Sequence, residues 1–104
     1  MSPPSSPYRT PEPGPLPVVV TTGPDVPGRV VVEILGVVRG VALRRVPSVP
    51  ETALEQAIAV RRAAELRLIE EAEQLRAHAV IGMRYDSNDG EIVAYGTAVR
   101  LQEA

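Results

Sequence analysis

The sequence has no cysteine, phenylalanine, tryptophan or lysine among its 104 residues. Without cysteine the chain can form no disulfide, thiolate nucleophile or thiolate zinc site. Three tyrosines are its only aromatic residues, so its core must be built from valine, alanine, leucine and isoleucine. A core of such small side chains is thin, and domains of this size often gain stability by association. Composition therefore predicts an oligomer.

The chain also lacks an excess of positive charge. Its net charge is −2 and its pI about 5.4, which gives no indication of a nucleic-acid surface. No apolar run approaches the roughly 20 residues that a transmembrane helix needs. The first residues also lack the apolar segment of a secretory signal. We expect a soluble cytoplasmic protein that contacts neither nucleic acid nor membrane.

Proline divides the chain into two parts. Seven of the 11 prolines fall within residues 1–17, which contain few large apolar residues. Such a segment cannot offset the entropy of ordering it, so we predict a disordered, Pro-rich tail at 1–17 and one domain at 18–104. The P-x-x-P spacings in the tail would also suit a protein partner with an SH3-like groove.

Three strands are predicted before a single helix. Residues 17–22 form a short β-branched run, and residues 29–46 are rich in valine but interrupted by Gly36 and Gly40. We interpret the latter as one strand through Val38, a reversal or kink near Gly40, and a further short strand. Each glycine is a candidate bulge, or a place where another backbone approaches.

A long helix is predicted from Glu51 to about Arg76. Pro50 and Glu51 suit a first turn, and apolar residues follow at steps of three and four. This apolar stripe contains Leu54, Ala57, Arg61, Ala64, Leu68, Ala72 and Leu75, widened by Ile58 and Ile69. The helix is long for so small a domain, so part of its apolar face is expected to pack on a neighbouring subunit.

A hairpin closes the domain, with strands at 79–85 and 91–101 around the turn "SNDG". Val93, Tyr95, Thr97, Val99 and Leu101 should share one face, opposite Ala94, Gly96 and Ala98. The turn glycine is expected at positive φ. The fold class is α+β: a small, mostly antiparallel sheet covered by one long helix, in the order β-β-β-α-β-β.

Five segments together resemble the YbjQ-like family, whose label is heavy-metal-binding. These segments are "VVTT", "LGVVRG", the helical R-x-x-A-x-x-R-L, "AVIGMRYD" and "AYGTAV". The resemblance spans about Val18 to Leu101. It implies a dodecin-like subunit that assembles into a ring-shaped homopentamer.

The resemblance also carries a set of matching residues. They are Thr21, Thr22, Gly36, Gly40, Arg61, Ala64, Arg67, Gly82, Arg84, Tyr85, Asp86, Tyr95, Gly96 and Thr97. The sequence departs from the family in two shortened loops, in Arg76 where a glycine is usual, and in His78 where a small polar residue such as Asn is usual.

Metal-binding and catalytic signals are weak. Candidate metal ligands are His78, Glu33 and Asp86, and only a ring that collects several copies would give them a full ligand set. The turn "DSNDGE" resembles the start of a calcium loop, but its glycine comes one residue early. No catalytic motif is present, so we predict no enzyme and no cofactor. A polar pocket around Arg84, Tyr85 and Tyr95 is the enzymatic alternative.

The leading hypothesis is therefore a homo-oligomeric ring, most simply a pentamer. It would act as a scaffold or as a module that binds a small ligand or a partner. In this interpretation Arg84 and Asp86 form an ion pair between subunits, and Arg61 is paired at a subunit contact with Glu33 or Asp86. The alternative is a heavy-metal-binding or metal-sensing protein.

Overall fold

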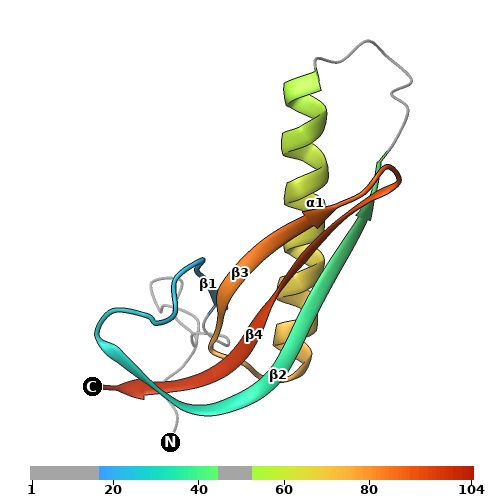
Figure 1. Cartoon of the computed structure of the whole chain (residues 1–104). Helices are drawn as coiled ribbons and strands as arrows, with labels where there is room; N and C mark the ends of the chain where they lie inside the picture. The colour runs from blue at the N-terminus through green and yellow to red at the C-terminus, as the bar shows by residue number, and fades with distance from the viewer. Residues whose placement is uncertain (1–16, 45–52) are drawn as a thin grey trace, which may run out of the picture.

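The computed structural model describes residues 17–44 and 53–104, which form one helix and a four-stranded sheet (Figure 1). The strands are β1 (Val19–Val20), β2 (Arg29–Leu43), β3 (Ala79–Ser87) and β4 (Glu91–Glu103), and the helix is α1 (Ala53–Gln74). The Pro-rich tail predicted at residues 1–17 lies outside the described residues except for Pro17, as does the predicted helix start at Glu51.

The sheet has the strand order β1-β3-β4-β2. β4 pairs antiparallel with both β2 and β3, whereas β1 pairs parallel with β3 through Val19 and Val20. The expectation of a small sheet with one long helix is confirmed, and the parallel pair makes the sheet mixed.

The expected break near Gly40 is wrong, because β2 runs unbroken from Arg29 to Leu43 and pairs with β4 along its length. The described part of the chain therefore has two strands before the helix instead of three. Gly40 keeps an extended conformation opposite Ala94. Its missing side chain makes room for the helix, and the chain does not turn there.

The glycine at position 36 does mark a bulge. The register between β2 and β4 shifts between Ile34 and Gly36, and Gly36 has φ of 131°, which a side chain rarely permits. A second shift lies between Val31 and Glu33. The two irregularities fall where β2 curves strongly across the sheet (Figure 1).

α1 covers one face of the sheet (Figure 1), and it approaches the backbone of β2 at Gly40. A Cβ placed on Gly40 would lie 2.0 Å from the carbonyl oxygen of Ala64 and 2.4 Å from the backbone nitrogen of Leu68. Strand and helix are thus in backbone contact. The buried side chains of α1 are Ala64, Leu68 and Ala72, all in its second half.

The two faces of the hairpin differ as the alternation predicts. Ala94 and Ala98 of β4 lie in the larger core cluster beneath α1, together with Val38, Val80 and Met83. On the opposite face, Ala79, Val99 and Leu101 form a smaller cluster against Val26, Val31 and Ile81.

The helix ends in a Schellman motif around Arg76. The N–H of Ala77 donates to the carbonyl of Ala72 (3.0 Å), and the N–H of Arg76 donates to that of Glu73 (2.9 Å). Arg76 has φ of 58°, a left-handed conformation that costs little only for glycine. The arginine at the usual glycine position therefore keeps the geometry that glycine would favour.

The hairpin turn is organised by Asn88. Its Oδ1 accepts hydrogen bonds from the N–H groups of Gly90 and Glu91, both at 2.9 Å. The positive φ expected at Gly90 is wrong, because the positive-φ glycines of the described residues are Gly28, Gly36 and Gly82. The asparagine side chain closes the turn by hydrogen bonding to its backbone, so Gly90 does not have to adopt a positive φ.

Gly40→Ala should strongly destabilise the fold, because the added methyl group collides with the backbone of α1. We expect a loss of about 3 kcal/mol or more in the free energy of unfolding, measured by urea denaturation at fixed protein concentration. Gly90→Ala is the matched control, since its nearest atom would lie 3.9 Å away. Equal stability of the two variants would contradict the close contact.

Arg76→Gly should instead stabilise the fold by about 1 kcal/mol, because it removes the left-handed strain of a residue with a Cβ. The carbonyl of Arg76, which accepts from Arg100, is retained. Arg62→Gly, at an exposed position inside α1, should lower the stability by about 1 kcal/mol. A lower urea midpoint for Arg76→Gly than for the native chain would refute this interpretation of the cap.

Candidate functional site

Tyr85 is the centre of a small polar cluster between β3 and α1. It pairs with Ala94 and projects from the helix-covered face, where its hydroxyl donates to Oε2 of Glu65 at 3.2 Å. The guanidinium of Arg61 lies 5.7 Å from the centroid of the tyrosine ring, within reach of a cation–π interaction. One turn of helix thus provides an anion for the hydroxyl and a cation for the ring.

The surroundings of Tyr85 raise its pKa above the ordinary value of 10.0. The largest cause is desolvation, followed by the negative charge of Glu65 and the hydrogen bond to it, while the positive charge of Arg61 acts in the opposite direction. Each raising cause disfavours the phenolate. Tyr85 is therefore a neutral hydrogen-bond donor here, which does not suit a general base at neutral pH.

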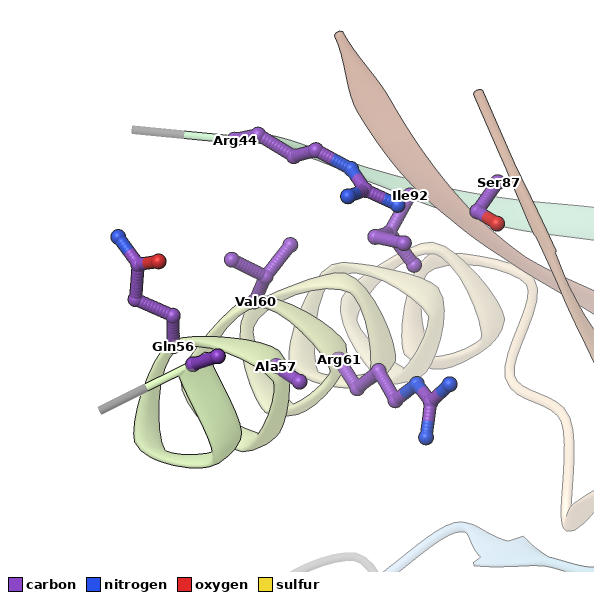
Figure 2. Close-up of a pocket in the computed structure, with 8 residues that line it drawn as sticks. Arg44, Gln56, Ala57, Val60, Arg61, Ser87 and Ile92 are labelled. Carbon is purple, nitrogen blue, oxygen red and sulfur yellow. The ribbon is translucent and has the colours of Figure 1, made fainter. Parts of the chain in front are cut away.

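A cavity of about 310 Å³ opens beside this cluster, at the first half of α1. Its walls come from α1, the end of β2 and the tip of the hairpin (Figure 2). The lining residues are Arg44, Ala53, Gln56, Ala57, Val60, Arg61, Ser87 and Ile92. Polar groups and an apolar surface therefore meet in one concavity, as in typical small-molecule sites.

A second group of family-matching residues joins the N-terminal segment to β3. Gly82 lies in a register shift of β3 with φ of 62°, and its N–H donates to Gly23 at 2.8 Å. Arg84 donates from Nη1 to the carbonyl of Thr22 (2.7 Å), and the N–H of Met83 donates to that of Thr21 (3.0 Å). Within one chain, Arg84 is thus a structural clamp.

The other matching residues are spread over the helix and the sheet. Arg67 donates to the carbonyl of Val41 at 2.7 Å, and Gly96 leaves room for Val80 and Ile81 of the same chain. Tyr95, Thr97 and Asp86 are at β-ladder positions, opposite Arg39, Val37 and Val93 respectively. The small face of β4 is thus filled by the chain's own strand and helix.

The three candidate metal ligands do not come together within one chain. Glu33 faces Arg100 across a 3.9 Å ion pair, and Nδ1 of His78 accepts from the N–H of Leu101 at 2.8 Å. Asp86 lies at the hairpin end of β3. Across residues 17–44 and 53–104, no group of three His, Cys, Asp or Glu side chains could hold a metal ion.

The pocket expected around Arg84, Tyr85 and Tyr95 does not form in the chain, because Arg84 and Tyr95 project from the face opposite Tyr85. The register of β3 and β4 places them there, since Arg84 pairs with Tyr95 and Tyr85 with Ala94.

Sequence reasoning found Arg61 but missed Arg44, Gln56 and the apolar lining of the cavity. In the sequence these residues stand out only as polar side chains within or beside apolar runs. That pattern can be recognised as a site only once the topology is known.

Fold and site define a class: small α+β domains in which one helix covers one face of a mixed sheet and leaves a cavity at one end. No helix in the described ranges is both long and apolar enough to cross a bilayer. A family model described as "Putative heavy-metal-binding" matches residues 50–102, slightly more than half of the chain. The chain belongs to this family, the YbjQ family, which confirms the resemblance seen in the sequence.

Curated relatives match most of the chain. A UPF0145 protein of Saccharolobus islandicus is 36% identical over 103 residues, which are 81% of this chain and 90% of that protein. One from Thermus thermophilus is 36% identical over 114 residues, covering 88% and 96% of the two chains. One from Thermotoga maritima is 38% identical over 105 residues, covering 83% and 99%.

A solved structure shares the fold. It is the crystal structure of a protein of unknown function, of the DUF74 family, from Pediococcus pentosaceus. The two match with a TM-score of 0.56 at 18% identity, over 82% of this chain and 98% of the other. At that identity the likeness concerns the fold alone.

The Tyr85 cluster predicts a late ionisation. In a spectrophotometric pH titration, the difference between the native protein and Tyr85→Phe should show a phenol that ionises above pH 10.0. Glu65→Gln should lower that pKa toward the ordinary value, because it removes the negative charge and weakens the hydrogen bond. Since the folded pKa is the higher one, the stability from this group is fully present below the unfolded pKa and is lost as pH rises through the folded pKa.

Arg62→Gln is the control for Glu65→Gln, because it alters a charge on α1 that is not part of the cluster. A difference titration with a midpoint at or below 10.0 would mean that Tyr85 is solvated and does not bond to Glu65.

Proposed function

We propose that this chain is the subunit of a homo-oligomeric ring that acts as a scaffold or as a binding module for a small ligand or a partner protein. It is not an enzyme in this proposal, and its place is the cytoplasm. The ring is dodecin-like and has five copies, the number that the family resemblance implies. The observation that carries the proposal is the exposed apolar edge of the sheet.

That edge is β2, a long strand that pairs only with β4 within the described sheet. Its exposed hydrophobic residues are Val30, Val32, Ile34, Val37 and Leu43. Ile34 is 71% exposed, although isoleucine is among the residues most often buried. A long apolar edge strand is a template for pairing with another chain, and a second copy that covers it would remove this aggregation hazard.

The core of the single chain supports the same proposal. Of the 14 buried hydrophobic residues in the described ranges, seven are alanine. Alanine contributes little buried area, so the fold gains less from burial than a core of leucine and phenylalanine would provide. The helix also leaves Leu54, Ile58 and Leu66 exposed. Association would bury the apolar surface that this thin core leaves outside.

Metal binding is the second candidate, because the description of the family carries it. Nδ1 of His78 accepts from the N–H of Leu101, so the neutral imidazole carries its proton on Nε2, and a metal binds there only if it displaces that proton or that hydrogen bond. One such nitrogen is a weak site, so several copies around a ring axis would have to share the ion. Both candidate functions therefore require the assembly.

Native mass spectrometry of protein purified without a tag or chelator tests the proposal. We expect a pentamer without bound metal, and Ile34→Glu should convert it to monomers because the added charge cannot be desolvated at a strand contact. Arg62→Gln is the matched control, since it lowers the net charge by the same amount at an exposed position of α1. Circular dichroism verifies that both variants stay folded.

Two results would overturn the proposal. A monomeric native protein would remove the assembly. A fixed number of metal ions in each ring would favour the metal-binding candidate if His78→Asn abolished it. That variant is chosen because the Asn Oδ1 can still accept from the N–H of Leu101 while the Nε2 atom is lost.

A further inference from the structure

The cavity at the first half of α1 exists because the helix is held close to the sheet only in its second half. Backbone contact at Gly40 and the burial of Ala64, Leu68 and Ala72 hold that half. Residues 53–60 contain no buried position, and Val60 is only partly buried. The space between this part of α1 and the sheet is the cavity of about 310 Å³.

Two arginines stand on different walls of this space. Arg44 extends from the end of β2 toward Ile92, whereas Arg61 projects from α1 with its guanidinium directed away from Arg44 (Figure 2). The guanidinium of Arg61 lies over the ring of Tyr85, and the ion pair between Arg100 and Glu33 lies elsewhere on the sheet. The nearest acidic group of the Tyr85 cluster, Glu65, accepts from the Tyr85 hydroxyl. The described lining of the cavity thus contains two arginines and no carboxylate, in a protein of net charge −2.

The other described lining residues are uncharged, and some are polar while others are apolar. Ser87 adds a hydroxyl from the hairpin tip, and Gln56 adds an amide from α1. Ala57, Val60 and Ile92 provide an apolar surface between these polar groups. A hydroxyl and a guanidinium are suitable donors to a carboxylate, and aliphatic side chains suit a short apolar body.

We propose that this cavity binds a small organic anion: a carboxylate with a compact apolar body. Arg44 and Ser87 contact the carboxylate, Ala57, Val60 and Ile92 contact the body, and Arg61 adds positive potential from the other wall. The volume is at the lower end of small-molecule pockets, which begin at roughly 300 Å³, so the ligand is smaller than a nucleotide.

This inference goes beyond the proposed assembly and does not depend on it. The eight described lining residues belong to one chain, so the test of the cavity requires no second copy. The two proposals can therefore fail separately. Native mass spectrometry reports the number of subunits, whereas the following experiment reports the cavity whatever that number is.

Benzoate is the probe, and benzamide is its neutral counterpart of nearly the same shape. Methyl-labelled protein is titrated with each, and the methyl resonances of Val60 and Ile92 report on the cavity. The methyl groups of Val99 and Leu101, in the small cluster on the other face of the sheet, are the internal control. Benzoate should shift the cavity methyls at saturation and bind about tenfold or more tightly than benzamide, because the guanidinium recognises its charge.

Variants then assign the roles. Arg44→Gln should weaken benzoate binding about tenfold, and Arg61→Gln about threefold, because only Arg44 makes the direct contact. Arg62→Gln is the matched control and should leave binding unchanged, since it removes the same charge from an adjacent position that does not line the cavity. Higher salt should weaken benzoate binding but leave benzamide unaffected.

Several results would overturn the assignment. If benzoate shifts no cavity methyl, or shifts the control methyls equally, there is no specific site. Equal affinity for benzamide would remove the role of charge. Inorganic phosphate that binds as tightly as benzoate would remove the role of the apolar body. If Arg44→Gln and Arg62→Gln weakened benzoate binding equally, the loss of affinity would reflect only the net charge of the protein.

Discussion

The fold depends on one contact, in which the backbone of α1 lies directly on the backbone of β2 at Gly40. This approach is possible because the residues around it are small: Ala42 and Ala94 on the sheet, and Ala64 on the helix. Dispersion falls steeply with distance, so short separations compensate in part for the absence of large side chains. A chain without phenylalanine and tryptophan can form a dense interior in this way, although not a large one.

The same contact explains the rest of the helix. A straight helix held against a curved sheet at one place must depart from it elsewhere, and α1 departs toward its first half (Figure 1). Arg44, Arg61 and Ile92 occupy the wider end, where there is room for side chains of that length. Tight packing and the cavity are therefore two results of one geometry, and the polar cluster of Tyr85 lies between them.

Much of this arrangement could be predicted from the sequence. Alternation assigned Ala94 and Ala98 to one face of β4 and Val99 and Leu101 to the other, because a strand has a strict period of two. The helix followed from its apolar spacing. The continuity of β2 could not be predicted, since a glycine that admits a helix and a glycine that bends a strand look alike in sequence. The cavity was missed because Arg44 and Gln56 meet only through the tertiary fold.

The parallel pairing of β1 has a consequence for the order in which the chain folds. β3 and β4 are joined by a short turn and can pair early, whereas β1 must find β3 across about 60 residues of intervening chain. We expect its two residues to dock after β3 has paired with β4, because the adjoining bonds of Gly82 to Gly23 and of Arg84 to Thr22 also need β3 in place. We therefore expect the N-terminal segment to dock last and to open first, because its strand is held to the sheet by only two paired residues.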